Sequence, residues 1–323
     1  MPIKNPPFEI TEKILTLTAQ ISELIGTVSA TGKEKPSVAL RRSNRIKSVY
    51  SSCAIEQNTL SLEQVTALIC GKRVLAPLKD ITEIKNAFEL YEHLSKLNPF
   101  SVDDLLFAHS VMTKDTVSES GCFRSKAVGV ADKDGNILHL GTLPAYVPQS
   151  VDNLLKWVQT SSLDMLIKSC IFHYEFELIH PFSDGNGRMG RLWHTLLLSK
   201  RNRLFEWLPI ESIVHDNQDK YYQAINRSNA EGNSTVFVEF MLETIKTALE
   251  QAVSTFDTKP SAEDRASQIV KYLKSHEYIM NADVRSMFGV SIATASRILK
   301  TLTEKQVLIK IRIGSFWGYK LKK

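Results

Sequence analysis

The stretch His180-Pro181-Phe182-Ser183-Asp184-Gly185-Asn186-Gly187-Arg188-Met189-Gly190-Arg191 places a titratable base, a carboxylate, three glycines, an amide and two arginines within twelve residues. Proline disfavours the helical conformation in the residue before it, so a helix is expected to end at His180. A glycine-rich loop follows, and the next helix is expected to open at Gly187. Because helix N-termini present free amides and glycines let an anion approach the backbone, the stretch predicts an anion-binding loop.

The side chains of this stretch suit a phosphate ligand. Arg188 and Arg191 are three residues apart, so they share one face of the predicted helix near the anion. A lone carboxylate beside phosphates, here Asp184, is suited to hold a magnesium ion. His180, with an ordinary pKa of about 6.5, suits proton removal from a hydroxyl at neutral pH. Each of these residue types alone is common in turns and at helix ends. An ordinary turn or helix end does not require all of them together in this order, so the combination favours a functional site.

Composition is ordinary for a globular protein. The 323 residues are 43% hydrophobic and 23% charged, which leads us to expect two or three domains. No apolar run approaches the roughly 18 residues of a membrane span, and the N-terminus lacks the apolar core of a secretory signal. The cysteines are scattered without a Cys-x-x-Cys pair, so neither a zinc site nor a disulfide framework is expected. We therefore expect a cytoplasmic protein without a membrane partner.

Apolar spacing predicts a largely helical body. Helices are expected at about 10–25, 38–56, 61–71, 80–97, 101–112, 151–159, 163–179, 187–200, 216–229 and 234–254. Ser61 with Gln64, and Ser101 with Asp104, resemble helix caps. Short apolar runs flank Asp134-Gly135, which predicts an isolated β-hairpin at about 126–142.

Basic charge gathers in the C-terminal part of the chain. From Pro260 onward twelve Lys and Arg face five Asp and Glu, a net of +7, which leaves −2 for the rest. After a linker at 255–261, helices are expected at 261–274, 282–287 and 291–304, and an alternating strand at 307–313. Residues expected to face inward on the last helix are Ile292, Ala295, Ile298, Leu299 and Leu302.

This C-terminal pattern is similar to winged helix domains. A basic module of this kind suggests contact with nucleic acid. The side chains available for DNA would be Thr294, Arg297, Lys300, Lys310 and Arg312. Protein contact or dimerisation is the alternative, and the sequence does not separate the two.

Residues 180–191 resemble the signature of the Fic family, His-Pro-Phe-x-Asp/Glu-Gly-Asn-Gly-Arg-x-x-Arg, at every fixed position. The hairpin upstream, Leu105-x-x-x-His109 and the pair Tyr221-Tyr222 extend the resemblance over about residues 1–250. It implies a mainly α protein, with an all-helical Fic body, a β-hairpin flap and a small α+β winged helix-turn-helix domain. The implied domains are an N-terminal helical region at 1–100, a catalytic core at 101–254 and the winged helix domain at 261–323.

The activity that this resemblance implies is AMPylation, the transfer of AMP from ATP to a Ser, Thr or Tyr hydroxyl of a target protein. His180 would deprotonate the hydroxyl, and Asp184 would bind Mg²⁺. The flap would hold the target chain by strand addition. The amides of Gly185 to Gly187 and the side chain of Asn186 would hold the α-phosphate of ATP, and Arg188 with Arg191 would hold the distal phosphates. Tyr221 and Tyr222 would also belong to the ATP site. Self-modification and a homodimer are open possibilities.

Ser52 and Glu56 resemble the family's inhibitory motif, Ser/Thr-x-x-x-Glu followed by Gly or Asn. By resemblance, Glu56 would pair with Arg191 and block the γ-phosphate, which would make this a class II protein. Gln57 stands where Gly or Asn is usual, so the local backbone geometry is open. The alternative is a glutamate exposed at a helix end without a partner.

Other functions remain as alternatives. The chain could be a DNA-binding regulator whose Fic body senses nucleotide, or a Fic enzyme that removes AMP from a modified protein, with water replacing the hydroxyl. A metal hydrolase using His173 with His180 is disfavoured, because their spacing of seven lacks the i, i+4 pairing of helical zinc ligands. His173 is expected to pack within its helix.

Overall fold

The computed structural model describes residues 5–30, 36–131, 137–257, 262–273, 275–313 and 316–322. The chain divides into two compact units, one of Met1–Lys35 with Arg41–Val253 and one of Pro36–Leu40 with Ser254–Lys323. In the described ranges, no helix is long and apolar enough to cross a bilayer. The expected hairpin turn at 132–136, part of the expected linker (258–261) and the end of the first C-terminal helix, at residue 274, lie outside these ranges.

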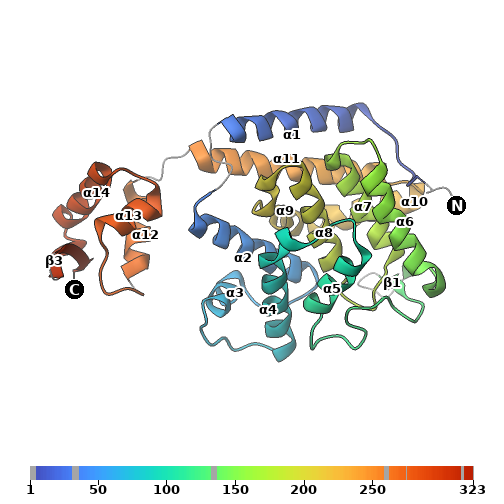
Figure 1. The fold of residues 1–323 in the computed structure, drawn as a ribbon, viewed down its shortest axis with the longest axis horizontal. Coiled ribbons are helices and arrows are strands. Elements are labelled where there is room, and N and C mark those ends of the chain that lie inside the picture. The colour runs from blue at the N-terminus through green and yellow to red at the C-terminus, as the bar shows by residue number, and fades with distance from the viewer. Residues whose placement is uncertain are drawn as a thin grey trace. The chain divides into compact units, whose positions relative to one another are not determined.

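Helices dominate the chain up to Asp257 (Figure 1). The helices are α1 (Glu12–Ala30), α2 (Val38–Ile55), α3 (Leu62–Ile69), α4 (Leu78–Glu92), α5 (Val102–Met112), α6 (Val147–Thr160), α7 (Met165–Ile179), α8 (Asn186–Arg201), α9 (Ile210–Asp216), α10 (Gln218–Glu231) and α11 (Thr235–Asp257). Short 3₁₀ turns are η1 (Leu94–Lys96), η2 (Pro144–Tyr146) and η3 (Arg203–Glu206). The predicted mainly helical body is thus confirmed.

Helix α8 forms the centre of the first unit. Its residues are buried continuously from Arg188 to Leu198, which is typical of a helix enclosed on all sides. Trp193 on this helix donates from Nε1 to the carbonyl of Pro99 at 3.0 Å. On the outside of the unit α1 runs along α11 (Figure 1), where Lys13 Nζ lies 2.8 Å from Glu243 Oε1. The packing around α8 therefore fixes the position of its N-terminal end.

The predicted hairpin is present as β1 (Gly129–Ala131) and β2 (Ile137–Leu140). The strands are antiparallel, with Gly129 opposite Leu140 and a register shift between Val130 and Ala131. In the described part of the chain these two strands pair only with each other.

Two helix predictions need correction. The helix expected over 80–97 ends at Glu92, because the amide of His93 bonds the carbonyl of Leu90 and tightens the chain into η1. Helix α9 was not predicted, since seven residues are too few to show a clear period. The capping box of Ser61 and Gln64 at the start of α3 is confirmed.

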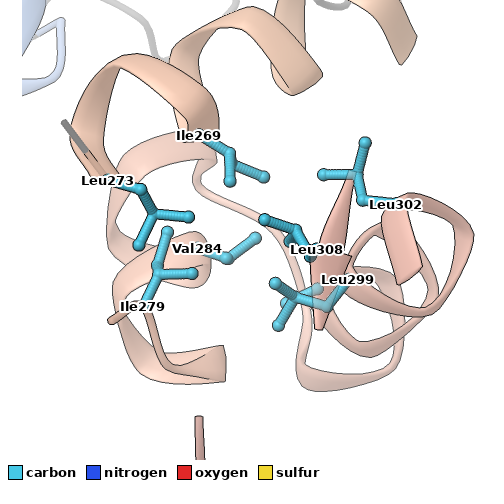
Figure 2. Packing of buried hydrophobic residues seen from close by; sticks show 8 residues of the cluster. Ile269, Leu273, Ile279, Val284, Leu299, Leu302 and Leu308 are labelled. Carbon is cyan, nitrogen blue, oxygen red and sulfur yellow. The ribbon is translucent and has the colours of Figure 1, made fainter. Parts of the chain in front are cut away.

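The second unit contains α12 (Ala262–Leu273), α13 (Asn281–Phe288), α14 (Ile292–Glu304), β3 (Leu308–Ile313) and β4 (Phe316–Leu321). The strands form an antiparallel pair, and Ile279 bridges to Tyr319. Figure 2 shows the core, formed by Ile269, Leu273, Ile279, Val284, Leu299, Leu302 and Leu308, with Ala295 also buried. Ile292 was expected inside, but as the first residue of α14 it is 62% exposed and is not part of this cluster.

Candidate active site

His180 ends α7 in the left-handed conformation, with φ 51° and ψ 63°. Its amide donates to the carbonyl of Phe176 at 2.9 Å. After a loop, Gly185 (φ 84°) caps α8, which begins at Asn186, one residue before the expected start. The structure therefore places a half-buried histidine at one helix end, a few residues from the N-terminus of the next.

Asn186 closes this loop. Its Oδ1 accepts from the amide of Phe182, and its Nδ2 donates to the carbonyl of Phe182, both at 2.8 Å. The side chain is 3% exposed. We expected Asn186 to hold the α-phosphate, but in the structure its amide oxygen and nitrogen both serve the loop backbone. It therefore shapes the loop in which the phosphate would lie.

His109 on α5 contacts the loop through Asp184 and Phe182. The amide of Gly121 donates to His109 Nδ1 at 3.0 Å, so Nε2 carries the proton and donates to the carbonyl of Asp184 at 3.0 Å. The ring stacks on Phe182 with centroids 3.7 Å apart. Burial lowers the pKa of His109 to about 4, which keeps this tautomer neutral. The sequence singled out His109 only as part of a family pattern, and its contacts to the loop were not predicted.

The buried Arg188 lies beside the half-exposed Asp184. Asp184 is about half exposed, and its Oδ1 accepts from the amide of Gly185 at 2.6 Å and lies 3.4 Å from Arg188 Nη2. Arg188 Nη1 lies 3.2 Å from Oε1 of the buried Glu83 on α4. The guanidinium thus lies between two carboxylates, a setting that the spacing of the two arginines does not reveal. In this arrangement Arg188 contacts Asp184, and its expected contact with the distal phosphates stays a prediction.

Arg191 is held by α2. Its Nε donates to Ser52 Oγ at 3.0 Å, and Nη2 donates to the carbonyl of Ser52 at 2.9 Å and to Glu56 Oε1 at 2.7 Å. Arg191 is 2% exposed. A Cβ atom on Gly187 would collide with Glu56 Oε1, so the carboxylate lies directly over the first turn of α8. A negative group already occupies the end of the helix where an anion is expected.

Glu177 on α7 lies in the same region as a neutral acid. Burial raises the pKa of its carboxyl to about 8, outweighing the opposing effect of Arg191. Its Oε1 is 3.9 Å from His173 Nε2. The carboxylate that pairs with Arg191 is that of Glu56.

Gln57 adopts the left-handed conformation with φ 66°, which accounts for the preference for Gly or Asn after the glutamate. The turn forms with glutamine. The amide of Asn58 donates to the carbonyl of Cys53 at 3.1 Å, and Asn58 Nδ2 donates to Glu83 Oε2 at 3.0 Å. These bonds hold the end of α2 next to α4 despite the strained residue.

Tyr221 and Tyr222 differ in burial. Tyr221 is 2% exposed, its hydroxyl lies 3.1 Å from His173 Nε2, and its ring packs near Phe237. It is therefore largely enclosed in the core, and its contact with ATP stays a prediction. Tyr222 is 37% exposed and packs on Tyr221 with centroids 5.3 Å apart. His173 is fully buried, as expected.

In the second unit, an exposed basic cluster lies on the strand pair. Lys310 Nζ is 4.3 Å and the Arg312 guanidinium 5.0 Å from the centroid of the Trp317 ring, which is half exposed. On α14, Arg297 and Lys300 are exposed. Thr294 is half-buried with Oγ1 3.1 Å from Ser291 Oγ, so it belongs to the helix cap and is less available than expected.

Two family models match the chain. One, described as the Fic/DOC family, matches residues 99–198. The other, described as a DeoR-like helix-turn-helix domain, matches residues 265–315.

The chain is similar to proteins named as adenylyltransferases. Protein adenylyltransferase fic-1 of Caenorhabditis elegans is 29% identical over 238 residues, which cover 69% of this chain and 44% of that protein. Protein adenylyltransferase Fic of Nematostella vectensis is 25% identical over 233 residues, covering 68% and 52%. The chain thus spans about half the length of the curated relatives it matches.

Solved structures match more of the chain. The crystal structure of a Fic family protein from Desulfovibrio desulfuricans G20 is 36% identical with a TM-score of 0.78, over 99% of this chain and 98% of that one. A structure of Fic-1 from C. elegans covers 76% of this chain and 72% of its own, at 22% identity and a TM-score of 0.62, and shows likeness of fold alone.

Proposed function

The chain belongs to the Fic family, and from that premise we propose that it is a protein adenylyltransferase, which transfers AMP from ATP to a hydroxyl side chain of a protein. Relatives named protein adenylyltransferase support the proposal. The observation that carries it is the position of His180, at the end of α7 and a short loop away from the N-terminus of α8. A base beside an anion-binding helix end suits attack by a hydroxyl on a phosphate.

In the proposed reaction, His180 accepts the proton of the target hydroxyl as the hydroxyl oxygen attacks the α-phosphorus of ATP. A bond forms between that oxygen and phosphorus, and the bond to the oxygen bridging the α- and β-phosphates breaks. Pyrophosphate leaves with the electron pair. The first amides of α8, which have no partner within the helix, stabilise the charge at the α-phosphate.

Asp184 fits a magnesium ion. Its exposed carboxylate offers the hard oxygen ligand that Mg²⁺ prefers, and such ions are commonly held by one or two carboxylates with substrate phosphates and water. Among the described residues there is no group of three or more His, Cys, Asp or Glu that could hold a metal without a substrate. When bound with ATP, the ion supplies neutralisation of phosphate charge. Arg188 would keep the Asp184 carboxylate oriented toward it.

Glu56 restrains this activity in our proposal. Its carboxylate lies over Gly187 and pairs with Arg191, so a γ-phosphate approaching Arg191 meets a negative charge. ATP must displace the carboxylate to obtain the same arginine. Because the target protein is not identified, transfer of AMP to the enzyme itself is the reaction to measure.

Isotope position tests the transferred group. Purified protein, as wild type and as Glu56→Gly, is incubated with Mg²⁺ and ATP labelled at the α- or the γ-phosphate. Protein-bound label is expected from the α-phosphate alone. Label from the γ-phosphate would show phosphorylation and contradict the proposal.

We also propose DNA contact through the second unit as a second function. The supporting observation is the exposed cluster of Lys310, Arg312 and Trp317 on β3 and β4, which offers two cations and an aromatic face. Exposed Arg297 on α14 adds a third cation in the same unit. Retention of the protein by duplex DNA that falls with added salt would support it, and salt-independent or absent retention would contradict it.

A further inference from the structure

Arg124, which precedes β1 and lies outside the signature, is a buried cation bonded to backbone carbonyls. It is 2% exposed. Its Nε donates to the carbonyl of His180 at 2.6 Å, Nη1 to that of Lys126 at 2.7 Å, and Nη2 to those of Thr142 and Ile179. Within the described ranges, no carboxylate forms an ion pair with Arg124. The charge is therefore neutralised by carbonyl dipoles that converge from three segments.

One of these segments contains the catalytic histidine. The left-handed conformation of His180 costs roughly 1–3 kcal/mol and persists only when the surroundings fix it. Arg124 supplies much of that fixation, because its own amide also donates to the carbonyl of Pro181 at 3.0 Å. The backbone and side chain of Arg124 together bond three consecutive carbonyls, those of residues 179 to 181.

The other two segments are the two ends of the hairpin. Lys126 precedes β1, and Thr142 follows β2. The amide of Thr142 also donates to Ile179 at 3.2 Å, so the hairpin base is tied to the same turn. A Cβ on Gly141 would lie 2.9 Å from Arg124 Nη2 and 3.3 Å from His180 Cβ, which explains why this position of the hairpin has no side chain.

We propose that Arg124 is a positioning residue that sets the distance between the hairpin edge and the imidazole of His180. The strands pair only with each other in the described part of the chain, so an extended target segment can bond to a strand edge. Arg124 then holds that segment's hydroxyl in reach of His180. A misplacement of about 1 Å between reacting groups can cost about 100-fold in rate.

Arginine suits this task better than lysine. Its planar guanidinium presents five donors in fixed directions, whereas an ammonium carries three donors at one point. Three nitrogens that serve four carbonyls in separate directions need the planar group. The inference rests on the proposed function, because it gives Arg124 a part in the transfer of AMP.

The test compares Arg124→Lys with Arg124 intact, both in the Glu56→Gly chain. Calorimetry with ATP and Mg²⁺ gives both the dissociation constant and the number of ATP sites in each sample. The self-labelling rate is then divided by that number of sites, so that misfolded protein does not lower the rate. We expect a dissociation constant for ATP within twofold and a rate per site lowered about 10- to 100-fold. Lys168→Gln is the matched control, because Lys168 is also buried and donates to a carbonyl, that of Ser161 at 2.9 Å, away from His180.

A second variant, Gly141→Ala, keeps Arg124 but adds a methyl group at the base of the hairpin, in close contact with Arg124 and His180. For this variant too, we expect a dissociation constant for ATP close to that of the parent and a lowered self-labelling rate per site. An unchanged rate per site in Arg124→Lys, or loss of ATP binding in both variants, would overturn the assignment and make Arg124 a residue of fold stability. If Glu56→Gly with Arg124 intact does not label at all, the proposed function fails, and this inference fails with it.

Discussion

Glu56 Oε1 lies 2.7 Å from Arg191 Nη2, although the residues are 135 positions apart in the chain. The pair joins the end of α2 to the first turns of α8. Ser52 bonds the same guanidinium through its hydroxyl and its carbonyl, so the orientation of Arg191 does not depend on Glu56 alone. Removing the carboxylate should therefore free an arginine that is already aimed at the loop.

Glu56→Gly is expected to raise self-labelling by roughly tenfold or more. A hydrogen bond to a charged group contributes roughly 1.5–3 kcal/mol, and the 35% exposure of Glu56 places the effect toward the lower end. Glu56→Gln, which keeps the shape and removes the charge, should raise it less. Labelled ATP measures the rates, with Glu89→Gln on α4 as the surface control. Unchanged labelling in a properly folded Glu56→Gly would remove the claim of autoinhibition.

Gln57→Gly is expected to strengthen the restraint. A non-glycine residue in the left-handed conformation costs roughly 1–2 kcal/mol, so glycine should stabilise the turn that holds Glu56. Basal labelling should fall a few-fold, and the melting temperature should rise slightly. Gln57→Ala is the control, since it removes the side chain and keeps the strain. A fall in labelling of the same size in both variants would show that the side chain, and not the backbone, matters.

Stability should fall in acid through His109. Its pKa is about 4 in the folded chain, where burial favours the neutral form, and near 6.5 unfolded. The unfolded chain thus binds a proton between these values and the folded chain does not. Stability from this residue is complete above about pH 7 and falls by about 2 kcal/mol on going to pH 5.

The comparison that isolates His109 is His109→Gln, because glutamine retains one donor and one acceptor. Urea unfolding at pH 7.5 and pH 5 should show a smaller pH dependence in this variant than in wild type. His173 and His194, whose pKa values are also lowered by burial, contribute to the dependence that remains, and Glu177, whose pKa is raised to about 8, contributes with the opposite sign. His93→Gln, at an exposed position, serves as control. Equal pH dependence in wild type and His109→Gln would contradict the buried neutral tautomer.

The cluster on β3 and β4 predicts a salt effect on DNA binding. Lys310→Ala and Arg312→Ala should each weaken binding to duplex DNA of any sequence. Each should also lower the slope of log K against log salt by about 1, since each removes one phosphate contact. Fluorescence anisotropy over a salt series measures both quantities, with Lys85→Ala on α4 as control. A slope unchanged in both variants would exclude this cluster from DNA contact.

Sequence predicted the parts of this molecule that depend on near neighbours. The capping box of Ser61 and Gln64 and the helix end before Pro181 follow from residues within a few positions. The hairpin strands and the helix-turn-helix also follow from local pattern. The resemblance, rather than the spacing, indicated that Glu56 faces Arg191, and the ion pair is present.

The remaining features depend on partners far away in the chain. Glu83 is paired with Arg188 across 105 positions, and Arg124 with the carbonyl of His180 across 56. Asn186 was expected to contact phosphate, but its contacts are with the loop backbone, because a buried amide satisfies its hydrogen bonds locally. Tyr221 was assigned to ATP from its position after the signature, and only the packing of α10 against the core shows that its hydroxyl is enclosed.

Intact-mass spectrometry of protein incubated with ATP and Mg²⁺ tests the central claim most directly, using wild type, Glu56→Gly and Glu56→Gly with His180→Ala. We predict a mass increase of one AMP, less water, that is small in wild type, large in Glu56→Gly and absent in the double variant. His180 is the base in this account, so its removal should abolish transfer while ATP still binds. An AMP adduct that persists without His180 would contradict the mechanism.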